Sequence, residues 1–314
     1  MPRKIIIDTD PGVDDAMAIL FALRCPELDV VGLTTVFGNV DVDLATTNAL
    51  HLAEFDQRQQ LLVARGAEKP LEIPFRGPAD FVHGDDGFGN TNLPAPTSIP
   101  IDQTAAEFIV DKIMSHPGEI TLVPIGPLTN IALALELEPR IVENVAEIVL
   151  MGGAARTAGN VSPVAEANIH CDPHAADKVF TAGWPVTMIG LDVTTKVITD
   201  EAYLESLRTS RAGDFIFRIS RFYQKFHEQV YGISAIHTHD PSAIAYLIRP
   251  ELFKTCSGAI RVPLDGLAMG QTIWDERGDW IFPNEWSDQP KVNVCLEVDD
   301  RQLLDLMRER LLSS

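Results

Sequence analysis

Four aspartates lie within eight residues near the start of the chain: Asp8, Asp10, Asp14 and Asp15. The apolar residues 5–7 precede them and predict a strand, so Asp8 and Asp10 should project to the same side where that strand ends. Asp14 and Asp15 begin the next helical pattern, where acidic side chains also serve as helix caps. Four carboxylates this close repel one another unless a cation neutralises them, and Ca²⁺ and Mg²⁺ prefer clustered carboxylate oxygens. The cluster therefore favours a bound metal ion over capping alone.

A second group of polar residues, Asn160, Glu166 and Asn168, follows the apolar run 147–151. Glu166 and Asn168 are two residues apart and present a carboxylate and an amide on one side of the chain. A sugar needs hydrogen-bond donors and acceptors together, so this pair suits hydroxyl recognition. An ordinary polar loop is the alternative interpretation of the same segment.

The third group is His239 and Asp240, followed by Pro241. Asp240 has the chemistry to complete a metal site, and His239 the chemistry of an acid or base near neutral pH. His237 lies two residues before His239, a spacing that also suggests a transition-metal site. A borderline metal such as zinc normally requires further His or Cys nearby, so we do not expect zinc here.

Short apolar runs alternate with longer helical patterns along the chain. The expected strands are 5–7, 30–36, 61–64, 120–124, 147–151, 186–191 and 292–298, and the expected helices are 14–23, 43–55, 105–114, 128–137, a stretch from 173, 200–230 and the C-terminus. This alternation predicts one Rossmann-like α/β domain over residues 1–314, with a mostly parallel sheet flanked by helices. Ligands bind at the carboxyl ends of the strands in such sheets. The loops 74–100 and 232–240 are candidates for functional segments.

Composition limits the partners that we expect. The 314 residues include 45 acidic and 25 basic side chains, a net charge of −20 that disfavours nucleic acid or an anionic membrane as a partner. No run approaches the ~20 apolar residues that span a bilayer, and the apolar run at the N-terminus is too short for a signal peptide. The four cysteines are scattered, which predicts reduced thiols and a cytoplasmic location.

The run 8–15, Asp-Thr-Asp-Pro-Gly-Val-Asp-Asp, resembles the N-terminal signature of the nucleoside hydrolases of the inosine–uridine preferring type. Further blocks at 34–39, 123–130, 151–153, 160–168 and 239–241 resemble the family in the same order. The resemblance therefore covers nearly the whole chain. It implies Ca²⁺-dependent hydrolysis of the N-glycosidic bond of ribonucleosides to free base and ribose, by a homodimer or homotetramer with broad or pyrimidine-leaning preference.

The resemblance also implies a role for each matching residue. The Ca²⁺ ligands would be Asp10, Asp15, the backbone carbonyl of Ile125, and Asp240. Asp10 would also be the general base that activates a metal-bound water, and His239 the acid that protonates the leaving base. The ribose-binding residues would be Asp14, Asn39, Asn160, Glu166 and Asn168. The base pocket would include His83, with His227, Tyr231 and His237 as further candidates.

Two other functions use the same residues. In a phosphatase, the Asp8-Thr9-Asp10 turn would bind Mg²⁺ and supply a nucleophile, but a phosphate pocket needs Lys or Arg, which are scarce around these motifs. In a non-catalytic nucleoside- or ribose-binding protein, the acid–base candidates Asp10 and His239 would have no purpose. The hydrolase is therefore the leading hypothesis.

Overall fold

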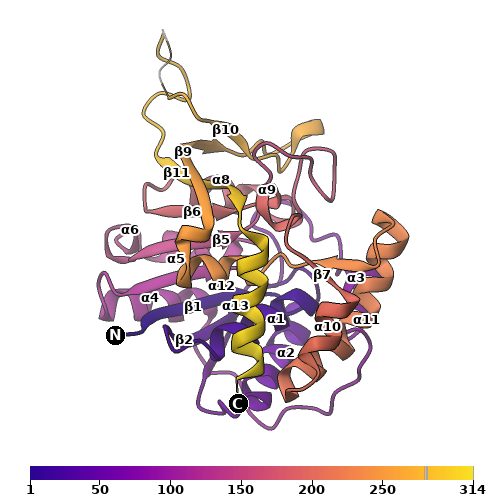
Figure 1. Ribbon diagram of the computed structural model, residues 1–314. Coiled ribbons are helices and arrows are strands. Elements are labelled where there is room, and N and C mark those ends of the chain that lie inside the picture. Colours follow the sequence, from indigo (N-terminus) through magenta and orange to yellow (C-terminus); the bar gives the residue numbers. More distant parts are fainter. Residues whose placement is uncertain (279, 281, 314) are drawn as a thin grey trace.

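The computed structural model describes residues 1–278, 280 and 282–313, and a nine-stranded sheet runs through it (Figure 1). The strands lie in the order β10-β9-β11-β6-β5-β4-β1-β2-β3. From β3 to β11 neighbouring strands pair in parallel, while β9 runs antiparallel to both β11 and β10. Their bounds are β1 Arg3–Thr9, β2 Leu28–Thr35, β3 Leu62–Arg65, β4 Ile120–Pro124, β5 Glu147–Met151, β6 Val186–Ile189, β9 Phe253–Arg261, β10 Ile273–Asp275 and β11 Lys291–Val298. The expected fold class, a mostly parallel sheet flanked by helices, is confirmed.

Helices cover both faces of this sheet, and alternation along β1 shows why. Ile5 and Ile7 belong to one buried apolar cluster and Ile6 to another, because successive strand side chains point to opposite faces. The first cluster is covered by α1 Val13–Leu23, α2 Val42–Phe55, α10 Glu201–Leu207, α11 Arg211–Tyr231, α12 Pro241–Ile248 and α13 Asp300–Leu312. The second is covered by α4 Ala105–Ser115, α5 Thr129–Leu137, α6 Ile141–Asn144 and α8 Pro173–Thr181. Figure 1 shows α13, in yellow, packed beside α1 and α12.

Several short elements connect the strands to the helices. They are α3 Asp80–His83, α7 Ala167–Cys171, α9 Leu191–Thr194, the 3₁₀ turns Pro250–Leu252 and Gly266–Ala268, and the antiparallel pair β7 Ile198–Asp200 and β8 Ala235–His237. The two loops singled out from the sequence, 74–100 and 232–240, contain α3 and β8 respectively. In the part of the chain that is described, no helix has the length and apolar character to cross a membrane.

The sequence pattern misses the strands β9 and β10. Along β9 exposed and partly exposed residues follow the buried Phe253, so the strand has no continuous apolar run to reveal it. The expected helix over 200–230 is in fact two helices, because Ser210 caps a new helix by accepting a hydrogen bond from the Gly213 N–H. The remaining expected elements agree with the structure to within about two residues, the usual spread of element boundaries.

Candidate functional site

An acidic cluster lies where β1 ends and α1 begins. Asp14, Asp15 and Asp240 each offer a carboxylate oxygen, and these three atoms lie within 4.8 Å of one another. Asp15 is fully buried, and Asp14 and Asp240 are nearly so. Asp240 directly precedes α12 and lies more than 220 residues after Asp15 in the sequence. Folding therefore brings together two of the three polar groups singled out in the sequence.

Hydrogen bonds hold Asp15 in one orientation within this acidic cluster. One of its carboxylate oxygens accepts from the Thr9 hydroxyl at 2.6 Å, and the other accepts from the Gly12 N–H at 3.0 Å. The Asn39 side-chain amide donates to that second oxygen, also at 3.0 Å. The Gly12 contact places Asp15 at the third position of α1, where an acidic side chain caps the helix. Asp15 is thus both a helix cap and a member of the acidic cluster.

Asp10 lies beside the acidic cluster, and one of its two carboxylate oxygens accepts no hydrogen bond from the described residues. Its Oδ2 accepts the Asn39 N–H at 2.6 Å, whereas its buried Oδ1 has no hydrogen-bond partner among the described residues. Two glycines leave room for this carboxylate. A Cβ on Gly38 would lie 2.0 Å from Asp10 Oδ2, and a Cβ on Gly126 would lie 2.5 Å from Oδ1. The backbone at Gly38 and Gly126 therefore lies so close to the Asp10 carboxylate that only glycine fits at these two positions.

Asp8, the fourth aspartate of the sequence motif, does not join the cluster. Its Oδ1 accepts from the Thr34 hydroxyl at 2.6 Å and from the Asn130 amide at 2.7 Å. Burial raises the pKa of Asp8 to about 7, although these two hydrogen bonds oppose the shift. Asp8 therefore links β1 to β2 and to α5, and the aspartates left as candidate metal ligands are Asp10, Asp14, Asp15 and Asp240.

The buried aspartates of the acidic cluster need a nearby positive charge to remain ionised at neutral pH. Burial raises the pKa of Asp14 to about 8, and the negative charge of Asp15 adds to the shift. Burial also raises the pKa of Asp10 and of Asp240 well above the ordinary value, again reinforced by neighbouring aspartates. An opposite charge nearby would favour the ionised carboxylates. The donor set of carboxylate oxygens, with the unpartnered Oδ1 of Asp10, fits a hard divalent cation.

A cavity of about 370 Å³ opens beside the acidic cluster. This volume is within the range of small-molecule sites. The residues from the sequence prediction that line it are Asp14, Asn39, His83, Ile125, Asn160, Glu166, Asn168, His227, Tyr231, His239 and Asp240. Asp10, Asp15 and His237 are not among the residues that line it. Nearly all of the predicted site residues are thus brought to one cavity or to its immediate surroundings.

One end of the cavity is polar, and its side chains are held by the backbone. The Glu166 carboxylate accepts from the N–H groups of Gly153 at 2.9 Å and Asn168 at 3.0 Å, which fixes it at the start of α7. The Asn168 amide donates to the carbonyls of Ile125 at 2.9 Å and Met151 at 3.1 Å. Burial raises the pKa of Glu166. A carboxylate and an amide thus face the cavity in fixed positions.

The other end is lined by aromatic and histidine side chains. His83 accepts the Val13 N–H through Nδ1 at 3.2 Å, and burial lowers its pKa to about 3. The rings of Tyr231 and His227 lie 5.3 Å apart, centroid to centroid. His239 is held by a 2.8 Å hydrogen bond between its Nδ1 and the Thr194 hydroxyl. Burial, and then the neighbouring histidines, lower the pKa of His239 well below its usual value.

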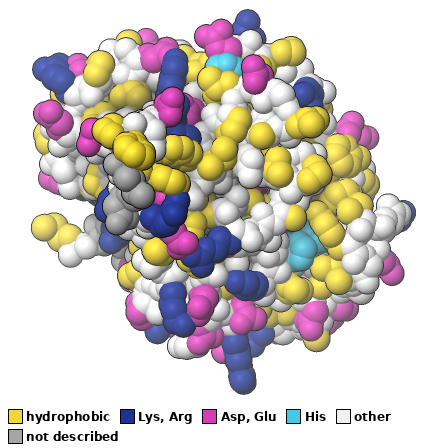
Figure 2. Space-filling view, turned by 90° about the horizontal axis from the view of Figure 1, so that it is seen from above, with side chains coloured by type: hydrophobic (Ala, Val, Ile, Leu, Met, Phe, Trp, Pro, Cys, Tyr) yellow, Lys and Arg dark blue, Asp and Glu magenta, His cyan; other side chains and the backbone are white. Residues whose placement is uncertain are grey.

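Figure 2 shows the surface from above Figure 1. Acidic and basic side chains are intermingled on this face, and hydrophobic side chains gather in its right half around a histidine. Among the described residues that line the cavity, none is Lys or Arg. The cavity therefore has none of the cationic side chains that a phosphate pocket uses.

Sequence reasoning missed several residues at this site. Tyr223 and Phe226 line the cavity from α11, and Thr194 holds His239. Tyr223 lies four residues before His227, so helical spacing would have placed both on one face. Thr194 gives no such signal, because it is 45 residues from His239 and its role depends on packing alone.

Comparisons with known proteins agree with one another. The sequence model of the family described as "Inosine-uridine preferring nucleoside hydrolase" matches residues 5–305. The "Probable uridine nucleosidase 2" of Arabidopsis thaliana is 45% identical, over 99% of this chain and 98% of its own length. The inosine-uridine preferring nucleoside hydrolase of Leishmania major is 42% identical, over 95% of each chain. The solved structure of a plant nucleoside hydrolase, PpNRh1, is 43% identical and covers 100% of both chains with a TM-score of 0.98.

Proposed function

The chain belongs to the inosine-uridine preferring nucleoside hydrolase family and is a ribonucleoside hydrolase, and from this premise we propose that it is Ca²⁺-dependent and uses Asp10 and His239 as base and acid. The observation that carries the proposal is the unpartnered Oδ1 of Asp10 beside three further buried carboxylates. Burying carboxylates without partners costs folding free energy. A protein that only binds nucleosides has no need of such an arrangement.

Asp10, Asp15, Asp240 and the backbone carbonyl of Ile125 would hold the Ca²⁺. Bound Ca²⁺ supplies positive charge that orients and acidifies water and grips the ribose hydroxyls. Burial, and then repulsion from neighbouring aspartates, raise the pKa values of Asp10 and Asp240, and these shifts support the assignment because a cation would favour the ionised carboxylates. Asp14 belongs to the same acidic cluster and, like Asp240, also lines the cavity, so it would reach both the ion and the 2′-hydroxyl side of the ribose.

Asp10 would take the proton from the attacking water at its free Oδ1. Its other oxygen is fixed by the Asn39 N–H, so the base does not need to reorient when the water loses its proton. Positioning therefore supports this role for Asp10.

The polar end of the cavity would hold the ribose. Asn160, Glu166 and Asn168 line the cavity together and offer both donors and acceptors to the sugar hydroxyls. Cleavage of the N-glycosidic bond builds positive charge on the ribose ring, as in other glycoside hydrolysis. The buried Glu166 carboxylate would stabilise that charge more in the transition state than in the bound substrate.

The histidine end would hold the base, and His239 would protonate it as it leaves. The 2.8 Å hydrogen bond ties Nδ1 of His239 to the Thr194 hydroxyl, which can donate or accept, so Nε2 is the nitrogen that would face a departing base. His83, His227, His237 and Tyr231 would surround the base and set the preference, which we propose to be broad or pyrimidine-leaning.

One assay tests the proposal against both alternatives. The purified protein is incubated with inosine, uridine, cytidine and a sugar phosphate, and free base and free phosphate are measured. Release of base that stops on chelation and in Asp10→Ala supports the Ca²⁺-dependent hydrolase. Release of phosphate alone would indicate the phosphatase, and tight binding without turnover would indicate a binding protein.

We also propose that the chain works as a single domain within a cytoplasmic homodimer or homotetramer. The resemblance to the family supports the homo-oligomer, the unbroken alternation of strands and helices supports the single domain, and the scattered cysteines support the cytoplasmic location. Sedimentation equilibrium of the purified protein tests the assembly state, and a monomer at micromolar concentration would contradict it.

A further inference from the structure

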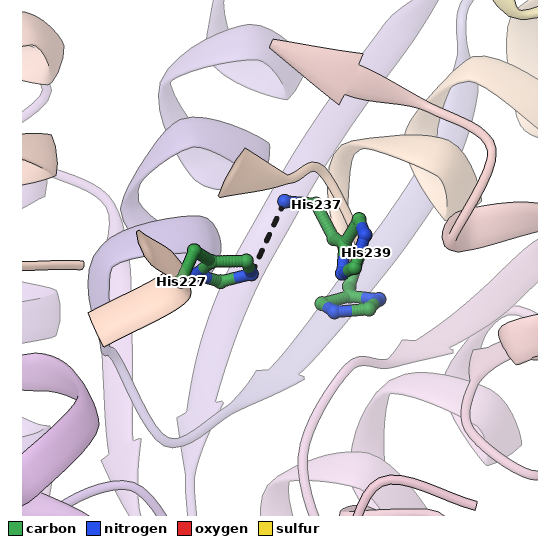
Figure 3. A group of neighbouring side chains, drawn as sticks. All are labelled: His227, His237 and His239. Atoms are coloured by element: carbon green, nitrogen blue, oxygen red, sulfur yellow. Dashed lines mark hydrogen bonds between the residues drawn. The ribbon is translucent and has the colours of Figure 1, made fainter. Parts of the chain in front are cut away.

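Three histidines meet at the base end of the cavity: His227, His237 and His239, which we call the histidine cluster. One ring nitrogen from each lies within 4.8 Å of one from both others. Figure 3 shows His227 reaching toward the other two from its own segment, α11, while His237 ends β8 and His239 precedes α12. The third histidine that a transition-metal site needs is therefore supplied by folding, not by the local sequence.

Hydrogen bonds engage Nδ1 of two of the rings. The Nδ1–H of His227 donates to the Tyr223 carbonyl at 3.0 Å, and its Nε2 accepts the His237 backbone N–H at 3.3 Å, a bond that a metal ion on Nε2 would replace. His239 engages Thr194 through Nδ1, so its Nε2 is the other candidate ligand atom. Histidines that bind metals typically bond their second nitrogen to a carbonyl or another polar group, as His227 and His239 do here.

The ionisation of the histidines suits a metal as well. Burial lowers the pKa of His227 to about 4 and also lowers the pKa of His237. Both rings are therefore neutral at pH 7, and neutral imidazole is the form that binds metal ions.

The geometry requires only a modest closure. A Zn–N bond of about 2.1 Å places two nitrogens of a tetrahedral site about 3.4 Å apart, so nitrogens that lie within 4.8 Å of one another need to approach by at most roughly 1.4 Å. His237 is only partly buried, and its ring makes no side-chain hydrogen bond with any other described residue, so it is free to make this movement. Three nitrogens would leave a fourth position open toward the cavity.

We propose that the histidine cluster is a second metal site, which takes a borderline divalent transition-metal ion such as Zn²⁺ and is separate from the acidic cluster. Imidazole nitrogens favour Zn²⁺, whereas the carboxylates of Asp14, Asp15 and Asp240 favour Ca²⁺. His227 and His239 line the cavity, so a bound ion excludes the base. Zn²⁺ then inhibits hydrolysis by competing with the nucleoside, a consequence that rests on the proposed function.

Calorimetric titration of the Ca²⁺-saturated protein with Zn²⁺ tests the site without any reliance on activity. We expect one Zn²⁺ per chain, with affinity reduced by about 100-fold or more in His237→Ala and in His227→Gln, which exceeds what loss of an outer hydrogen-bond partner usually costs. His51→Gln is the matched control, since His51 lies on α2 away from the cluster, and it should retain full affinity. The visible absorption of Co²⁺ bound in place of Zn²⁺ reports nitrogen coordination and should disappear in His237→Ala.

Unchanged Zn²⁺ affinity in both histidine variants, with circular dichroism showing them folded, would overturn the proposal. Zn²⁺ binding that is lost in Asp15→Asn instead would place the ion in the acidic cluster and would overturn it equally. The kinetic part is tested by Zn²⁺ inhibition of uridine hydrolysis, which should raise KM and leave kcat unchanged. Base release in the absence of Zn²⁺ tests the hydrolase separately. A protein that lacks the Zn²⁺ site would still release base, and a protein that is not a hydrolase would still bind Zn²⁺.

Discussion

The Thr194 hydroxyl and Nδ1 of His239 lie 2.8 Å apart, across an interval of 45 residues. Thr194 ends α9, the short helix that follows β6, and it is fully buried. The Thr238 N–H donates to the Val197 carbonyl at 2.8 Å, so the backbone on either side of this contact is also tied together. The ring of His239 is therefore oriented by the end of the central sheet rather than by its own loop.

Replacement of Thr194 by Val removes the hydroxyl and keeps the shape. We expect kcat for uridine to fall by about tenfold, less than the 100-fold minimum that a general acid typically contributes. Hydrolysis of p-nitrophenyl riboside should change little, because its leaving group needs no proton. Thr194→Ser should restore uridine hydrolysis, and an equal loss on both substrates would show that Thr194 acts only in packing.

His239→Ala removes the proposed acid itself. Inosine hydrolysis should fall by about 100-fold or more, the usual contribution of general acid catalysis. The p-nitrophenyl riboside again serves as the comparison, since its departure does not depend on protonation. Parallel losses for inosine and p-nitrophenyl riboside would contradict the acid role.

Asp10→Asn keeps the size of the side chain and removes its basicity. The Asn oxygen can still accept the Asn39 N–H, so the fold should be retained. We expect kcat for both inosine and p-nitrophenyl riboside to fall by at least about 100-fold, because both reactions need an activated water. Near-normal turnover by the Asn variant would exclude Asp10 as the base.

Removal of Ca²⁺ with a chelator should stop base release and lower the midpoint of thermal unfolding. The physical reason is that an ion bound only to the native state stabilises it, by about 2.7 kcal/mol at 100 times its Kd. Readdition of Ca²⁺ should restore both properties. Full activity in the chelated protein would show that the acidic cluster does not need an ion for catalysis.

Asp8 should make the metal-free protein less stable as pH rises. Its folded pKa of about 7 lies above the ordinary value of 3.8, so ionisation is easier in the unfolded chain. The free energy of unfolding of the wild type should therefore decline relative to Asp8→Asn between about pH 4 and pH 7, by up to roughly 1.4 kcal/mol per pH unit. Urea unfolding of both proteins at several pH values measures the difference, and a difference that is independent of pH would contradict the raised pKa.

The sequence by itself determined which residue types are present for the chemistry of the site, and the alternation of strands and helices that positions them. Periodicity is a local property, so the parallel strands and most helices could be predicted from neighbouring residues, as could the placement of Asp10 at the end of β1 and of Asp14 and Asp15 at the start of α1. The strand β9 was missed because exposed and partly exposed residues follow its buried first residue, which leaves no continuous apolar run.

Only the tertiary structure decided which of these residues meet. It separated Asp8 from the acidic cluster through Thr34 and Asn130, brought Thr194 to His239, and completed the histidine cluster with His227. Such contacts join segments that packing alone brings together, and no local pattern encodes the distance between them. The residue types at the site could therefore be named from the sequence, whereas their partners, burial and pKa shifts arise from the fold.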